Sequence, residues 1–218
     1  MSPKTVVQTS IKHGLDIIAI CDHNSCENVK AVKKAALPYD LSVIAGMEIN
    51  SKEEVHLLGL FPKDDLLEEV QNIVYSNLPG KNDRDFFGDQ IVMDEDDRII
   101  NQNNRLLIGA TGLSVEEIVK IIHQFEGLAI ASHIDRPSYS LISQLGFVPE
   151  DLGLDGVEVF SKEMPKVPEN MPVVFSSDAH RPEEIGRRYT RFSLNGGNFS
   201  EIRMAFKGIK DHKIIAVE

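Results

Sequence analysis

Residues 175–180 read Phe175-Ser-Ser-Asp178-Ala-His180, and they follow the short apolar run Met171-Pro-Val-Val. An apolar run of this length predicts a buried strand. Residues two apart in an extended segment point to the same side, so Asp178 and His180 would project together from the carboxyl end of that strand. In parallel α/β folds this end of the strands carries the active site. Imidazole nitrogen and carboxylate oxygen both suit zinc, manganese or iron.

A simpler interpretation of Asp178 is that it caps a short helix beginning at Arg181. For an isolated Asp-X-His the cap is the commoner outcome, because helix caps far outnumber metal sites. The choice therefore depends on whether other strand ends supply further ligands.

Four more apolar runs predict strands, and each carries a metal-competent side chain at or near its end. The runs cover 15–21, 41–45, 54–61 and 128–131, and their side chains are His23, Glu48, His56 and His133 in that order. The first run is almost continuously apolar, which favours a parallel strand buried on both faces. Helical patterns between the strands indicate an α/β fold with a parallel sheet or barrel.

Four of the seven histidines therefore lie at predicted strand ends. Any one of them is as easily a capping or core residue as a ligand, but their joint placement is harder to attribute to chance. The other three, His13, His123 and His212, are expected to be ordinary surface or helix-terminal residues. A cluster of His, Asp and Glu can hold two or three divalent ions, and such sites hydrolyse phosphate esters with metal-activated water.

The α/β pattern breaks between residues 79 and 112. Within this stretch two short apolar runs surround an acidic turn, which predicts a hairpin over 90–100. We expect 79–112 to be an insertion over one face of a single domain that spans 1–218, where it could act as a lid. Glu95-Asp96-Asp97 in the turn is expected to be solvated rather than a set of metal ligands.

Composition and charge limit the classes of function. The chain has 218 residues, of which 42% are hydrophobic, and a net charge of −11, which argues against broad binding to long nucleic acid. Its two cysteines form no disulfide framework and suit a reducing cytoplasm. No signal-peptide pattern or apolar stretch approaching a membrane span is present, so no membrane association is expected. The chain also has no Gly-X-Ser-X-Gly elbow, glycine-rich phosphate loop or Rossmann fingerprint.

Taken in order, five motifs resemble those of the PHP (polymerase and histidinol phosphatase) family. They are Asp22-His23-Asn24, Gly46-Met-Glu48, Val55-His56-Leu-Leu-Gly, Ser132-His133 and Ser177-Asp178-Ala-His180. The resemblance spans about residues 3 to 190 outside the insertion. It implies a distorted seven-stranded β/α barrel with a cleft at the strand carboxyl ends. It also implies two or three divalent ions of zinc, manganese or iron, and phosphoesterase activity.

Carried over by motif, the resemblance assigns six metal ligands: His23, Glu48, His56, His133, Asp178 and His180. Glu48 would bridge two ions, and Asp22 would orient a ligand without touching metal. Arg136 and Arg181 follow their histidines closely, and a guanidinium suits bidentate phosphate binding, so both are candidate catalytic residues. The alternative for each arginine is a surface salt bridge.

The family opens with a strand bearing His-X-His, and this chain has no such segment, so the expected barrel is incomplete at its amino terminus. Two interpretations stay open. Either the chain starts at an internal methionine, which the intact remaining ligands favour, or it is a degenerate member. In both cases we expect less complete metal binding, and the exposed sheet edge makes a homodimer a hypothesis.

The sequence therefore predicts a metal-dependent phosphoesterase. Its substrate would be a phosphorylated small molecule, a nucleotide or a short oligonucleotide. The alternative is a non-catalytic, degenerate PHP module that binds metal or nucleotide. A metallohydrolase acting on C–N bonds fits the order of the ligands less well.

Overall fold

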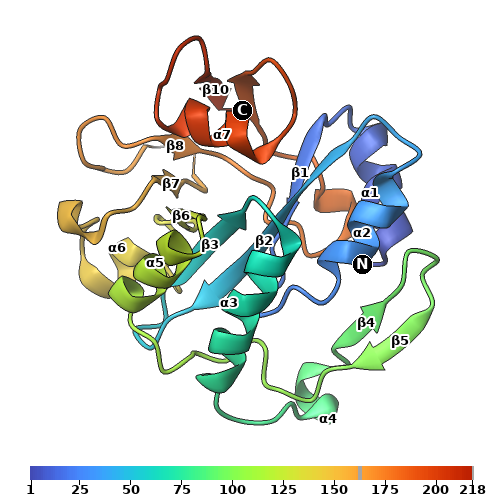
Figure 1. Ribbon diagram of the computed structural model, residues 1–218. Coiled ribbons are helices and arrows are strands. Elements are labelled where there is room, and N and C mark those ends of the chain that lie inside the picture. The colour runs from blue at the N-terminus through green and yellow to red at the C-terminus, as the bar shows by residue number, and fades with distance from the viewer. Residues whose placement is uncertain (162–163, 218) are drawn as a thin grey trace.

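The computed structural model describes residues 1–161 and 164–217. Its central element is an open, curled sheet with the strand order β1-β2-β3-β6-β7-β8 (Figure 1). The strands are β1 Ile17–Ile20, β2 Ser42–Asn50, β3 His56–Phe61, β6 Leu128–Ala131, β7 Gly156–Glu158 and β8 Val173–Val174. The predicted α/β class is confirmed. A closed seven-stranded barrel is not seen in the described residues, where the sheet has six strands and ends at β1 and β8.

The sheet is mixed rather than wholly parallel. Strand β3 is antiparallel to β2 and β6, and the other neighbouring pairs are parallel. Only residues 51–55 connect β2 to β3, which is too short for the crossover that a parallel pair needs. The Ser51 hydroxyl holds this turn by accepting from the backbone N–H groups of Glu53 and Val55, each at 3.2 Å. The start of β3 therefore lies beside the end of β2.

Strand alternation separates the main core from the opposite face of the sheet. Ala45, Met47 and Ile49 of β2 pack in the core cluster to which α3 and α5 contribute. Ile44 belongs instead to a second cluster with side chains of α7. Glu48, an even number of residues after Ile44, therefore lies on the α7 side of the sheet.

Helices cover both faces of the sheet (Figure 1). They are α1 Pro3–Lys12, α2 Val29–Ala36, α3 Asp64–Ser76, α5 Val115–Gln124, α6 Leu141–Leu145 and α7 Phe199–Phe206. Helix α5 begins in a capping box, in which Ser114 Oγ accepts from the Glu117 N–H and the Glu117 carboxylate accepts from the Ser114 N–H. Helix α7 packs beside the antiparallel pair β9 Thr190–Ser193 and β10 Lys213–Val217. No helix in the described ranges is long and apolar enough to cross a bilayer.

Strand β1 is correct in position but differs from the prediction in its burial. It pairs only with β2 among the described strands, and it forms one end of the sheet. Ala19 is exposed, and the other three residues of β1 are half-buried. The prediction that this strand is buried on both faces is therefore wrong, because its outer edge borders an open cavity rather than another strand.

The predicted hairpin is confirmed, and its acidic turn has a structural role. The segment forms α4 Arg84–Phe87, β4 Ile91–Met93 and β5 Ile99–Gln102, and it lies near the start of α1 (Figure 1). The Asp97 carboxylate accepts from Ser2 Oγ at 2.7 Å and from the Lys4 backbone N–H at 2.9 Å. Asp96 pairs with Lys4 Nζ at 2.8 Å. The turn is therefore not simply solvated, because it supplies the cap at the start of α1.

Asp97→Ala should lower the free energy of unfolding by about 1 kcal/mol, the usual loss when a helix N-terminus loses its capping oxygen. Urea unfolding followed by circular dichroism measures this change. The matched control is Asp96→Ala, which removes exposed ion pairs to Lys4 and Arg98 and should have a smaller effect. Equal losses in the two variants would show that Asp97 does not act as the cap.

Candidate metal centre

Four predicted ligands converge at one edge of the sheet. Glu48 lies near the end of β2, and His23 follows β1 and forms a β-bridge with Glu48. His56 is the first residue of β3 and is paired in register with Asn50. His133 comes shortly after β6. Because β3 is antiparallel to its neighbours, its first residue meets the last residues of β2 and β6.

Glu48 is the centre of this group and is only 4% exposed. Its Oε2 lies 3.2 Å from His23 Nδ1, and its Oε1 lies 3.2 Å from His56 Nδ1. His133 Nε2 is 3.4 Å from the same Oε1 and 3.3 Å from His56 Nδ1. We call His23, Glu48, His56 and His133 the Glu48 cluster.

Asp178 and His180 lie at the margin of the Glu48 cluster. Asp178 Oδ2 is 2.6 Å from Arg136 Nη1, so this carboxylate is held by a cation. The His180 side chain is 61% exposed, and its Nδ1 lies 3.8 Å from Asp178 Oδ1. Its ring centroid is 5.8 Å from that of His23. The structure thus places the pair beside the cluster but outside its closest contacts.

The alternative interpretation of Asp178 as a helix cap is wrong. The helical turn that follows it, Pro182–Glu184, begins after Arg181. The Glu184 carboxylate, rather than that of Asp178, accepts from the backbone N–H groups of His180 and Arg181, at 2.9 and 3.1 Å. Asp178 is left free to face the cavity and Arg136.

The turns that carry these side chains are held in strained conformations. Non-glycine residues with left-handed φ include Asn24 at 48°, His133 at 27°, Tyr139 at 55° and Asp178 at 43°. Each such residue costs about 1–3 kcal/mol, and residues of this kind concentrate at functional sites. All four lie on, or next to, residues of the candidate site.

Glu158 supports the Glu48 cluster, and the sequence pattern assigned it no role. Its carboxylate is 3% exposed and accepts from Ser132 Oγ at 2.8 Å and from the His133 backbone N–H at 3.1 Å. It also accepts from Ser176 Oγ. Burial raises the pKa of Glu158. This side chain therefore joins the turn carrying His133 to the segment carrying Asp178. Its position between the apolar residues Val157 and Val159 is the signal that could have indicated a buried polar role.

Tyr139 was not predicted either. Its ring stacks on that of His56 with centroids 4.8 Å apart, and its backbone carbonyl accepts from the His56 N–H at 3.0 Å. The contact fixes the orientation of the imidazole. No local sequence pattern could have indicated it, because the two residues are far apart along the chain.

The remaining predicted residues divide between the site and the surface. Arg136 lies at the site through its contact with Asp178. Arg181 is exposed on the turn before Pro182–Glu184. Asp22 is exposed, and its carboxylate accepts from Asn28 Nδ2 at 3.3 Å rather than from a cluster histidine. The supporting role expected of Asp22 stays a prediction.

The histidines outside the candidate site are not all surface residues. His13 ends α1 and His123 lies in the last turn of α5, and both are exposed as predicted. His212 is only 4% exposed, so its prediction as a surface residue is wrong. Its Nε2 lies 3.6 Å from Glu201 Oε2 and 3.4 Å from Asn195 Nδ2, contacts that form only when the carboxyl-terminal segment folds onto α7.

The directions in which the pKa values of Glu48 and His23 shift suit metal binding. Burial alone would raise the pKa of Glu48, but the close approach of His133 and His56 holds that pKa well below its usual value. Burial lowers the pKa of His23, and the charges of His56 and His180 act in the same direction. An ionised carboxylate and neutral imidazoles are the forms that coordinate metal.

One buried atom indicates where a cation would bind. Glu48 Oε1 is buried and makes no aligned hydrogen bond to any described residue, although two imidazole nitrogens lie close to it. Buried polar atoms nearly always have a partner, so an orphaned carboxylate oxygen among histidines marks a place for a cation. Three imidazoles and one carboxylate form a donor set that suits zinc, manganese or iron. The residues present therefore fit a divalent transition metal.

Lowering the pH should destabilise the metal-free protein through His23. Because the pKa of His23 is lowered by folding, the unfolded chain takes up a proton first as the pH falls below about 6.5. The stability contributed by the neutral ring is present above that pH and is lost below it. His23→Gln should therefore reduce the drop in unfolding free energy between about pH 7.5 and 5.5, measured with urea in the presence of a chelator. His13→Gln is the control, and an unchanged slope in His23→Gln would contradict the assignment.

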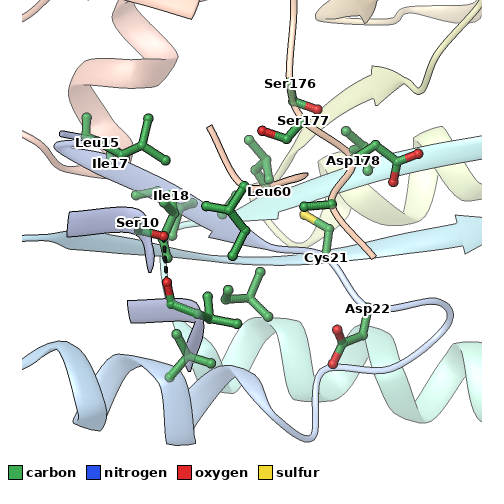
Figure 2. Close-up of a pocket in the computed structure, with 18 of the residues that line it drawn as sticks. Ser10, Leu15, Ile17, Ile18, Cys21, Asp22, Leu60, Ser176, Ser177 and Asp178 are labelled. Carbon is green, nitrogen blue, oxygen red and sulfur yellow. Dashed lines mark hydrogen bonds between the residues drawn. The ribbon is translucent and has the colours of Figure 1, made fainter. Parts of the chain in front are cut away.

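The cluster opens into a cavity of about 1530 Å³. His23, Glu48, Glu158 and Asp178 lie along its polar part, and apolar residues of β1 line much of the rest. Figure 2 shows Ser176, Ser177 and Asp178 on one side of this cavity, with Cys21 and Asp22 nearby on the segment that follows β1. A cavity of this size accommodates a ligand as large as a nucleotide.

Comparison of the chain with known protein families identifies its family. Residues 1–146 match the PHP domain, and residues 169–208 match the PHP-associated region. The chain belongs to the PHP family. The resemblance carried by the sequence motifs is thus confirmed, and the Glu48 cluster falls within the part that matches the PHP domain.

Relatives of this PHP chain share part or all of its length. The uncharacterized protein MJ1587 of Methanocaldococcus jannaschii is 27% identical over 159 residues, which are 73% of this chain and 66% of that protein. The lesion-specific endonuclease PfuEndoQ of Pyrococcus furiosus has a TM-score of 0.73 at 20% identity, over 100% of this chain and 54% of its own. A protein of Bifidobacterium adolescentis, named as a proposed metal-dependent phosphoesterase, has a TM-score of 0.59 at 16% identity. The similarity covers 96% of this chain and 92% of that protein.

These structural similarities show a shared fold. The PHP chain spans about half the length of PfuEndoQ, at 54%, and slightly under two thirds of MJ1587, at 66%. A structure of Endonuclease Q in complex with a 27-mer duplex carrying an abasic lesion at the active site is similarly close, with a TM-score of 0.72 at 19% identity, over 98% of this chain and 53% of that chain.

Proposed function

We propose that this PHP chain is a metal-dependent phosphoesterase. The observation that carries the proposal is the Glu48 cluster, in which a buried carboxylate with one oxygen lacking an aligned partner is surrounded by three imidazoles. The cluster lies beside an arginine, at the polar part of a cavity that admits a nucleotide. This combination suits the cleavage of an anionic ester.

Each oxygen of Glu48 would serve a different ion. Oε2 faces His23, and Oε1 faces His56 and His133, and these contacts support a carboxylate that would bridge two ions. Asp178 and His180 lie next to His23 and would complete the first position, with Asp178 exchanging its contact with Arg136 for the metal. Divalent zinc, manganese or iron bound there would polarise the ester and activate water.

Residues of the chain would position the substrate and the ligands. Arg136 carries a planar guanidinium that can bind two phosphate oxygens at once, as the sequence predicted for a catalytic arginine. Arg181, which is exposed, is the weaker candidate for this role. Glu158 and Tyr139 hold His133 and His56 in place through a hydrogen bond to the His133 N–H and a stacked ring on His56. Residues that orient ligands in this way commonly change metal affinity by about 10–100-fold.

Phosphodiesters of nucleic acid belong among the candidate substrates. Net charge disfavours long nucleic acid as a partner. The similarity in fold to Endonuclease Q, which is seen with a DNA duplex, instead supports long nucleic acid as a partner. We therefore propose nucleotides and short oligonucleotides first, with longer strands as a class to be tested.

The second candidate is a PHP module that binds metal or nucleotide without catalysis. The observation that favours it is the ion pair between Asp178 and Arg136, which withholds one predicted ligand from the Glu48 cluster. A module of this kind would still take up metal, since the four cluster residues are in contact without Asp178.

Turnover assays separate the two functions. The protein is stripped with a chelator, reloaded with manganese, zinc or iron, and incubated with p-nitrophenyl phosphate, bis-p-nitrophenyl phosphate and a thymidine dinucleotide. A phosphoesterase releases product from at least one of these substrates, and the chelator stops the reaction. Metal-loaded protein that turns over none of them, in parallel with an active phosphodiesterase as the assay control, would establish the non-catalytic module instead.

A further inference from the structure

An aromatic ring beside the candidate metal centre is contacted by two arginines. Phe160 comes shortly after β7, and 38% of the residue is exposed. The guanidinium carbon of Arg136 lies 4.3 Å from the ring centroid, and that of Arg188 lies 3.8 Å from it. We call Arg136, Phe160 and Arg188 the Phe160 stack.

The Phe160 stack is tied to the candidate site by its backbone. The carboxylate of Asp135, the residue before Arg136, accepts from the N–H groups of Phe160 at 2.7 Å and Ser161 at 2.6 Å. Ser177, the residue before Asp178, donates its hydroxyl to the Arg188 carbonyl at 3.1 Å. The ring and both guanidinium groups are therefore held by the same turns that carry site residues.

Stacking leaves the hydrogen-bonding edge of a guanidinium available. The ring covers a guanidinium face, whereas the five N–H groups lie in the guanidinium plane and point away from it. Arg136 uses one of its nitrogens for Asp178. Arg188 Nη1 is buried, and it has no hydrogen-bond partner among the described residues. A buried charged donor without an acceptor is costly, so this atom marks a place where an acceptor enters with a ligand.

Charge and position indicate what that ligand is. The chain has a net charge of −11, so two cations held against one ring form an exception to its general character. Arg188 lines the same cavity as His23, Glu48 and Asp178. A phosphate offers several oxygens to the planar fork of a guanidinium, so it suits the unpaired donor of Arg188.

We propose that Arg188, held against Phe160, forms a second anion subsite, which binds a phosphate other than the one that Arg136 would orient at the Glu48 cluster. The preferred ligands are then molecules with two phosphates, as in a nucleoside 3′,5′-bisphosphate or in neighbouring phosphates of a nucleic-acid strand. The inference rests on the proposed function for the identity of the first phosphate. Binding at Arg188 itself requires no turnover.

Calorimetric titration of the protein as purified tests this subsite. The two probes are thymidine 5′-monophosphate and thymidine 3′,5′-bisphosphate, which differ by one phosphate. We expect the bisphosphate to bind at least about tenfold more tightly, the range of a charge-assisted hydrogen bond. Arg188→Gln should remove most of that difference while leaving the affinity for the monophosphate within about twofold, because only the second phosphate contacts Arg188.

Two further variants control for a general loss of positive charge and for misfolding of Arg188→Gln. Arg105→Gln is the matched control, because the guanidinium carbon of Arg105, in the segment 79–112, lies 4.1 Å from the ring centroid of Tyr75 of α3. Both nucleotide affinities should stay unchanged in this variant. Arg188→Lys keeps the charge without the planar fork, so it should lose part of the preference even if Arg188→Gln does not fold. Thermal unfolding of each variant reports whether the fold is intact.

Several results would overturn the subsite. They are equal affinity of the wild type for the two nucleotides, no binding of either one, and an equal loss for both nucleotides in Arg188→Gln. The last result would place Arg188 at the reacting phosphate. A chain that prefers the bisphosphate but hydrolyses no ester would keep the subsite and refute the phosphoesterase, so the two failures are distinguishable.

Discussion

Glu48→Gln should abolish tight binding of divalent metal and with it any metal-dependent hydrolysis. Glutamine keeps the shape of the side chain but removes the charge, while all three imidazoles of the Glu48 cluster depend on this one carboxylate as their anionic neighbour. We expect metal affinity to fall by at least about 100-fold, the upper end of losses seen even for groups that act on ligands indirectly. Elemental analysis after dialysis measures the metal content, and the ester assays measure the rate.

The matched control for this change is Glu117→Gln, which alters an exposed carboxylate at the start of α5. It should leave metal content and hydrolysis unchanged, although it weakens the capping box at the start of α5. If Glu48→Gln retained the metal content of the wild type, the ions would have to bind elsewhere, and the Glu48 cluster would lose its proposed role.

Glu158→Ala should weaken both the fold and the metal centre. The change leaves three donors without an acceptor: the hydroxyls of Ser132 and Ser176 and the backbone N–H of His133. Each buried donor left unpaired costs about 1–3 kcal/mol, so we expect a loss of about 3 kcal/mol or more in urea unfolding of the metal-free protein. Metal affinity should fall by about 10–100-fold, because the turn that carries His133 is released.

Glu158→Gln separates the role of the acceptor from that of the charge. The amide oxygen can still accept from Ser132 and His133, and the amide nitrogen can donate to the hydroxyl of Ser176. Burial raises the pKa of Glu158, so the neutral amide is also easier to bury than the carboxylate at neutral pH. This variant should therefore keep most of the stability that Glu158→Ala loses. Equal destabilisation in both would mean that the hydrogen bonds of Glu158 do not support the site.

The positions of the main strands could be predicted because each is a short apolar run bounded by polar residues. Their directions could not be predicted from the alternation with helices alone. The short connection 51–55 makes β3 antiparallel, and this reversal is what places His56 next to Glu48. The burial of β1 was overestimated because an apolar run does not show whether a second strand lies beside it.

The residues of the Glu48 cluster were more predictable than the residues that support them. His23, Glu48, His56 and His133 could be identified because each follows or begins a strand, and strand ends meet at one edge. The contacts of Glu158 and Tyr139 join segments far apart in the chain, so no local pattern indicates their partners, although the place of Glu158 between two valines indicates a buried polar residue. Arg188 ranked below Arg181 as a candidate for the same reason, since only the folded chain brings it against Phe160.

The most direct test of the account is the position of a bound metal. Crystals of the protein grown with zinc would be measured at the zinc absorption edge, and an anomalous difference map would locate the ions. We predict a peak about 2.0–2.2 Å from a Glu48 oxygen and from at least one imidazole nitrogen of the Glu48 cluster. A map with no peak at Glu48, or with ions held only by residues outside the cluster, would contradict the account.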